Sequence, residues 1–61
     1  MEIGDHIQFI STGVRGLVVK ITQQGSTDFV HVLCGPDADG DGGGEILAFP
    51  RAVIEDRIWI L

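Results

Sequence analysis

The stretch from residue 4 to residue 21, GDHIQFISTGVRGLVVKI, sets the strongest limit on how this chain can fold. Within 6–10, Ile7 and Phe9 fall on one face and His6, Gln8 and Ile10 on the other, which predicts a half-buried β-strand because successive side chains of a strand point to opposite faces. A turn is predicted at 11–16, where Gly13 and Gly16 can adopt positive φ without strain. Residues 17–21 are rich in β-branched side chains and favour a second strand. The stretch therefore predicts the first hairpin of a small antiparallel β-barrel.

Further apolar runs separated by turn-forming residues predict three more strands. A hairpin loop is expected at 22–28, a central strand at 29–34 and a glycine-rich loop at 35–44. The next strand is expected at 45–49, and Pro50 ends it or places it at an edge. A single 3₁₀ turn at 51–56 then leads to a last strand at 57–61. A helix over 51–61 is the alternative for the C-terminal segment. Its β-branched content favours the strand.

Three short patterns in the first hairpin carry a resemblance to a known fold. The Ile-Gly-Asp start at 3–5, the Thr-Gly-x-x-Gly turn at 12–16 and the Val-Val-x-Ile run at 18–21 resemble the beginning of SH3-like barrel domains. KOW-type domains of ribosomal and transcription-elongation proteins, and small uncharacterised archaeal SH3-like barrel proteins, begin in a similar way. The resemblance implies an all-β fold, with residues 1–61 forming a single five-stranded antiparallel SH3-like barrel and a short 3₁₀ turn before the last strand. Unlike KOW domains, the chain has only Arg15 and Lys20 as basic residues around the turn.

The size of the chain limits the kinds of function it can carry. A chain of 61 residues lies near the lower limit for folding without a disulfide or metal, and little of its core is left to enclose a substrate. No serine or cysteine has a base motif around it, so we expect neither an enzyme nor a cofactor. There is no apolar run long enough to cross a membrane and no signal-peptide pattern at the start, so a cytoplasmic location is expected.

Cys34 is the only cysteine, which excludes an internal disulfide and fits a reducing compartment. We interpret it as a small buried apolar residue near the end of a strand, with a reactive or metal-binding thiol as the alternative. The chain has four Lys and Arg against nine Asp and Glu, a net charge of −5. This balance disfavours binding to phosphate backbones.

The acidic loop has part of a calcium-binding pattern. Asp37, Asp39 and Asp41 alternate as carboxylates do at the start of an EF-hand loop, and Glu45 could add a fourth acid. The position that should hold a bidentate Glu is Ala48, and no helix flanks the loop. The pattern predicts a solvated acidic loop and no metal site, with weak calcium binding as the alternative.

Four residues are candidates for contact with a partner. Trp59 and Phe49 are expected to complete the core, as large aromatic residues on late strands of small barrels do. If one of them is instead exposed beside Phe9 or Phe29, it forms the apolar patch by which SH3-like domains hold a peptide or another subunit. Arg15 and Arg51 are candidates for contact with an acidic partner. The terminal Ile-Trp-Ile-Leu has no charged residue to protect its edge, which favours a protein partner or a homodimer through this strand. We expect a non-catalytic binding or assembly module that contacts protein, with a KOW-like domain associated with nucleic acid as the rival.

Overall fold

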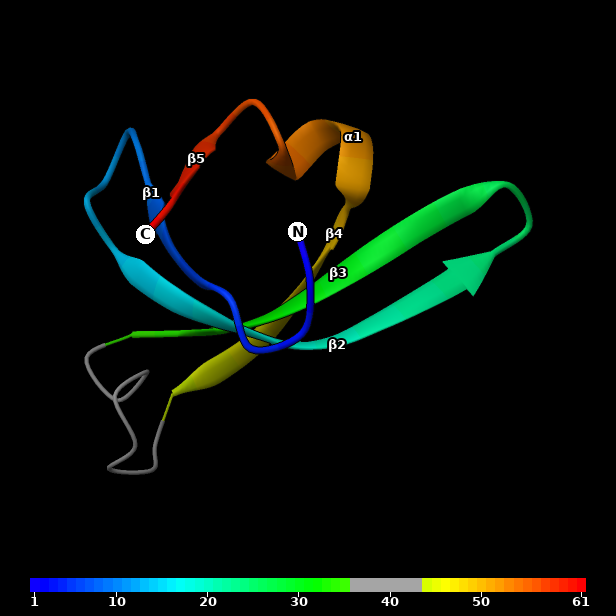
Figure 1. The fold of residues 1–61 in the computed structure, drawn as a ribbon, viewed down its shortest axis with the longest axis horizontal. Helices are drawn as coiled ribbons and strands as arrows, with labels where there is room; N and C mark the ends of the chain where they lie inside the picture. The colour runs from blue at the N-terminus through cyan, green and yellow to red at the C-terminus, as the bar shows by residue number, and fades with distance from the viewer. Residues whose placement is uncertain (36–43) are drawn as a thin grey trace.

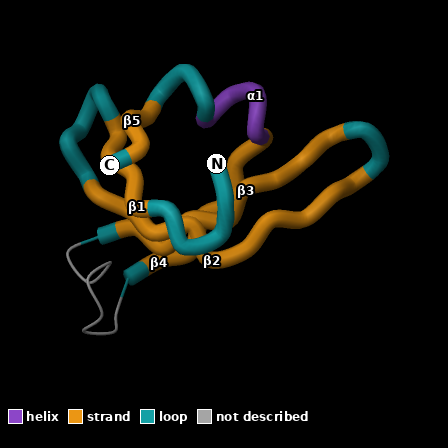
Figure 2. The backbone as a smooth tube through the Cα atoms, viewed as in Figure 1, coloured by secondary structure: helices purple, strands orange, loops and turns teal. Residues whose placement is uncertain are grey.

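A computed structural model describes residues 1–35 and 44–61, which form one antiparallel sheet and one helical turn (Figure 1). The elements in chain order are β1 (His6–Phe9), β2 (Arg15–Gln24), β3 (Thr27–Cys34), β4 (Glu45–Pro50), α1 (Arg51–Ile54) and β5 (Ile58–Ile60). The strands are ordered β4-β3-β2-β1-β5 in the sheet. The prediction of a mostly β, five-stranded antiparallel domain is confirmed, with β3 inside the sheet and β4 at its edge. Figure 2 shows the helical turn between β4 and β5.

The first hairpin is tighter than its sequence predicts. Gly13 has φ of +74°, as expected for the turn. Gly16 does not belong to the turn: it lies in β2, opposite Ile7 of β1 and Cys34 of β3. A Cβ at this position would lie 2.5 Å from the Cγ1 atom of Val32, so a glycine is needed here because the core packs against the backbone.

The second hairpin corrects the predicted loop at 22–28. Both strands continue through this polar segment, with Gln24 opposite Thr27, and only Gly25 and Ser26 make the turn. Gly25 has φ of +61°, and positive φ at the first turn position is the pattern of a type II′ turn. The segment is polar because the end of the β2–β3 hairpin projects beyond the rest of the molecule (Figure 1).

The core lies on the inner face of the curled sheet. Its buried residues are Ile7, Val18, Val30, Val32, Ile54 and Ile58, from four strands and α1. The ring centroids of Phe9 in β1 and Phe49 in β4 are 5.6 Å apart. Three strand spacings separate β1 from β4, about 14 Å in a flat sheet, so the sheet must curl for these rings to meet. Among the described residues, β4 and β5 each pair with one neighbour only.

The segment before the last strand is one α-helical turn instead of the predicted 3₁₀ turn. The backbone N–H of Glu55 donates to the carbonyl of Arg51 at 3.0 Å, which is α-helical spacing, and Arg57 then donates to Ile54 at 2.9 Å with 3₁₀ spacing. The side chains of Arg51 and Glu55 also pair, and this contact suits the α-turn. The alternative helix over 51–61 is wrong, because β5 pairs with β1. In the described part of the chain, no helix has the length and apolarity needed to cross a membrane.

Candidate binding face on the outer side of the sheet

The side chains that point away from the core form an outer face, which the strand register defines. Directly opposite residues on antiparallel neighbours share a face. One outward row crosses all five strands; in sheet order it contains Leu61, His6, Leu17, Leu33 and Ile46. Leu61 joins the row because its N–H donates to the carbonyl of His6 at 2.8 Å. We call the four aliphatic residues of this row, Leu17, Leu33, Ile46 and Leu61, the apolar band.

The apolar band faces solvent at both of its ends. Ile46 is 60% exposed and Leu61 is 61% exposed, while Leu17 and Leu33 between them are half-buried. The described helix does not cover this band, because α1 inserts Ile54 into the core on the inner face. Leu17, Leu33 and Ile46 are adjacent across three strands, and His6 separates them from Leu61. Exposed apolar patches of this kind are a common feature of protein-binding surfaces.

Trp59 lies beside the apolar band on the same face. It is 58% exposed and stands opposite Gln8 of β1, which in turn stands opposite Arg15 of β2. The fold thus brings two of the predicted partner-binding residues, Trp59 and Arg15, into one cross-strand row. Gln8 between them is held by its own hydrogen bond, since its Nε2 donates to the carbonyl of Gly13 at 3.1 Å.

Charge is distributed unevenly between the two faces. Arg15 and Lys20 both belong to the outer face of β2, where Lys20 stands opposite His31. The acidic residues of the described strands, Asp28 and Glu45, share the inner side with Gln23 and Cys34. The outer face of the described strands therefore carries cationic side chains and no acidic side chain, although the chain as a whole has a net charge of −5.

A β-bulge sets the position of Lys20. The register between β2 and β3 shifts between Val18 and Lys20, which leaves Val19 as the extra residue. Without the shift, Lys20 would fall on the same face as the buried Val18. The bulge therefore places the second cation on the outer face. His31 beside it is fixed by a 2.9 Å hydrogen bond between its Nε2 and the hydroxyl of Thr22.

Phe49 lies on the other side of the sheet from Trp59. It stands opposite the buried Val30, is half-buried, and packs its ring on Phe9. The predicted pair of late aromatic residues is thus divided between the two faces. Phe49 belongs to the core side, and Trp59 is exposed.

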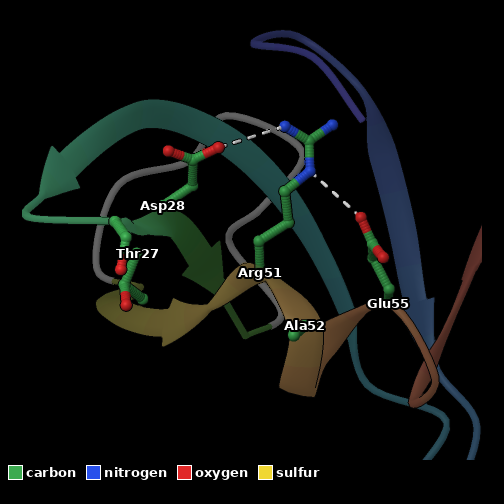
Figure 3. Close-up of a pocket in the computed structure, with 6 residues that line it drawn as sticks. Thr27, Asp28, Arg51, Ala52 and Glu55 are labelled. Carbon is green, nitrogen blue, oxygen red and sulfur yellow. Dashed lines mark hydrogen bonds and ion pairs between the residues drawn. The ribbon is translucent and has the colours of Figure 1, made fainter.

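Arg51 belongs to a separate pocket between the end of the second hairpin and α1 (Figure 3). The pocket has a volume of about 280 Å³ and is lined by Ser26, Thr27, Asp28, Arg51, Ala52 and Glu55. Arg51 Nε lies 3.0 Å from Glu55 Oε1, and its Nη1 lies 3.7 Å from Asp28 Oδ2. Two carboxylates within the chain therefore offset its charge, which leaves little attraction for an anionic ligand.

Cys34 and Glu45 stand opposite each other at the ends of β3 and β4. Partial burial, and secondly the charge of Glu45, raise the pKa of the Cys34 thiol, so the group stays protonated at neutral pH. Its Sγ lies 3.6 Å from the carbonyl oxygen of Val32. A protonated, half-buried thiol is a weak nucleophile.

The calcium alternative stays a prediction. Asp37, Asp39 and Asp41 lie outside the described residues, and Glu45 is exposed at the start of β4. Within 1–35 and 44–61, no group of three or more potential ligands is placed to hold a metal ion.

The aliphatic residues of the apolar band were not identified from the sequence. Their signal in the sequence is the segment at 29–34, which has apolar side chains on both faces and for that reason predicts a central strand. Alternation within one strand does not show whether its second face is covered. The band became visible only when the register aligned Leu17, Leu33 and Ile46 across neighbouring strands.

The chain matches no family model, and comparisons with curated proteins and with solved structures give no match either.

Proposed function

We propose that this chain is a non-catalytic binding or assembly module that contacts protein, built on a sheet curled as an SH3-like barrel. The pairing of β1 with both β2 and β5 supports the barrel, as does the contact between Phe9 and Phe49 across the inner face. The helical turn between β4 and β5 agrees with it. An experimental structure with direct contacts between β4 and β5 would test closure.

The exposure of Trp59 is the observation that carries the protein-binding function. A tryptophan that is 58% exposed leaves a large apolar surface in water, and tryptophan is among the residues that most often dominate protein interfaces. It lies on β5, which pairs with β1 among the described strands, and it stands beside the apolar band. Apolar residues at the centre of a contact surface with polar residues around them are typical of protein interfaces.

The composition of the outer face favours protein over nucleic acid. The centre of the face is aliphatic, at Leu17, Leu33 and Ile46, where a base finds no ring to stack on, and the exposed ring of Trp59 lies beside it. The strands contribute two formal cations to the face, Arg15 and Lys20. Two phosphate contacts on a chain with a net charge of −5 give little electrostatic attraction for a nucleic acid.

Affinity capture from the native cell tests the proposal when the proteins captured by wild type are compared with those captured by a Trp59 variant. Wild type, Trp59→Ala and the matched control Val53→Ala are each used as bait, and captured protein and nucleic acid are both analysed. Val53 is also an exposed apolar residue, but it lies on α1. We expect wild type and Val53→Ala to retain the same protein and Trp59→Ala to lose it.

Two results would contradict a protein-binding function. One is that wild type and Trp59→Ala capture the same proteins although both variants show a cooperative thermal unfolding transition. The other is nucleic acid that stays bound to purified wild type after all other protein has been removed.

A further inference from the structure

We infer that the partner segment is acidic and apolar: it places aliphatic or aromatic side chains along the apolar band and carboxylates against Arg15 and Lys20. This inference rests on the protein-binding function proposed above and adds the chemistry of the partner. It follows from the segregation of charge between the two faces of the sheet.

The sign of the charge on the outer face is opposite to that of the chain. The chain has a net charge of −5, yet the acidic residues of the described strands, Asp28 and Glu45, both fall on the inner side. Arg15 and Lys20 fall on the outer side and are exposed. Charges of one sign on a contact face select partners of the other sign and speed their encounter.

The two cations flank the apolar band on β2. Arg15 lies two positions before Leu17, and Lys20 is the next outward residue after it, beyond the bulge at Val19. Because the bulge takes up one residue, Arg15 and Lys20 are four ladder positions apart, which at about 3.4 Å each puts their Cα atoms about 14 Å apart. A single helix or extended segment, about 10–12 Å wide with its side chains, fits between them. Carboxylates on both sides of its apolar stripe would then reach both cations.

The length of the band sets the length of the segment. Four strand spacings separate Leu61 from Ile46, which is about 19 Å measured along the curled sheet and an upper limit for the straight distance. A helix of about 13 residues, or an extended segment of about six, covers that distance. Either can carry an apolar stripe with acidic residues beside it.

A second copy of this chain is a poor occupant of the same face. Symmetric contact between two outer faces would bring the Arg15 and Lys20 side chains of both copies together. Like charges facing each other across an interface oppose association. An aliphatic band flanked by cations therefore fits an acidic peptide better than it fits itself.

Selection from a displayed library of random peptides of about 13 residues, the length set by the band, tests this inference. Wild type should enrich peptides in which Asp or Glu flank Leu, Ile or Phe. Arg15→Glu/Lys20→Glu should instead enrich Lys and Arg at the flanking positions. A peptide selected on wild type is then synthesised, and its Kd is measured for a set of variants.

The variants separate local charge from total charge. Arg15→Gln/Lys20→Gln and Ala52→Glu/Val53→Glu both change the net charge from −5 to −7, but Ala52 and Val53 are exposed on α1. We expect the first to weaken peptide binding about tenfold and the second to leave it within about twofold. Arg15→Lys/Lys20→Arg keeps both charges and should retain binding, and a wild-type-like thermal unfolding transition of the Gln variant excludes a folding defect as the cause. Added salt should weaken wild type and leave the Gln variant nearly unaffected.

The outcomes distinguish failure of the inference from failure of the function. One outcome would overturn the acidic partner and leave protein binding intact. In it, the enriched peptides lack acidic residues, bind wild type and the Gln variant equally, and bind Trp59→Ala weakly. No enriched peptide, together with saturable binding of a single-stranded oligonucleotide that requires Arg15 and Lys20, would overturn both. No binding of either probe would also count against both.

Discussion

The side chain of Val32 in β3 leaves no room for a side chain at position 16 of the neighbouring strand β2. A Cβ added there would lie 2.5 Å from Val32 Cγ1 and 3.5 Å from Ile7 Cγ1, inside the core. We expect Gly16→Ala to lower the free energy of unfolding by about 1–3 kcal/mol through overpacking. Gly13→Ala should cost about 1–2 kcal/mol for a different reason, its φ of +74°, because the nearest atom to its added Cβ is 3.9 Å away.

Double-mutant cycles with Val32→Ala, measured by urea unfolding, separate these two causes. Removing Cγ1 should relieve Gly16→Ala, so the two substitutions should cost less together than their sum. Gly13→Ala combined with Val32→Ala should be additive. Additivity in both cycles would show that the close approach to Val32 is not what requires a glycine at position 16.

The thiol of Cys34 gives a second prediction at the residue scale. Its pKa lies above the ordinary value of 9.0 because of burial and, secondly, Glu45. Well below pH 9.0 the thiol is protonated in both the folded and the unfolded chain, so its contribution to stability is fully present. As the pH rises from 9.0 through the raised pKa, the unfolded chain loses the proton first, and the free energy of unfolding falls.

Two measurements check the thiol. The rate of alkylation by iodoacetamide should have its midpoint above pH 9.0, and Glu45→Gln should move it only part of the way back, since burial is the larger cause. Cys34→Ala should lose less stability than wild type over that pH range. A wild-type midpoint at or below 9.0 would contradict the prediction.

At the scale of elements, α1 is held to the sheet by packing more than by charge. Ile54 is buried in the core, whereas the side chains of Arg51 and its partners Asp28 and Glu55 are each 38% exposed or more. We expect Ile54→Ala to cost about 2–4 kcal/mol. Arg51→Ala should cost less than about 1 kcal/mol, and its effect should shrink in high salt. Thermal and urea unfolding check both, and a larger loss for Arg51→Ala than for Ile54→Ala would show that the ion pairs fix this turn.

At the scale of the whole molecule, the charge of the outer face bears on self-association. We expect sedimentation of the free chain at micromolar concentration in low salt to show no dimer through the outer faces, because symmetric contact would oppose Arg15 and Lys20 of both copies. Trp59 should be readily quenched by acrylamide, and a bound acidic peptide should protect it. A dimer that Trp59→Ala abolishes would instead place a second copy on the outer face.

Local patterns along the chain determined the kind of elements and much of their order. The alternation over β1, the β-branched run of β2 and the apolar run of β3 were sufficient to predict strands, because side-chain period and backbone sterics are local properties. Pro50 correctly indicated an edge strand, since it has no N–H to donate to a further strand. The polar residues at 22–28 were misleading, because a strand that projects into solvent has the same composition as a loop.

Tertiary structure decided the candidate site. Whether Trp59 or Phe49 would be exposed depended on which face of β5 and β4 met the core, and a shift of one residue reverses this. The bulge at Val19 and the register of β2 with β3 placed Lys20 on the outer face, and the pairing of β5 with β1 brought Trp59 into the row of Arg15. The sequence by itself determined that this chain forms strands with apolar residues on both faces. Only long-range pairing decided which face became the core and which remained in water, because that choice depends on residues far apart in the chain.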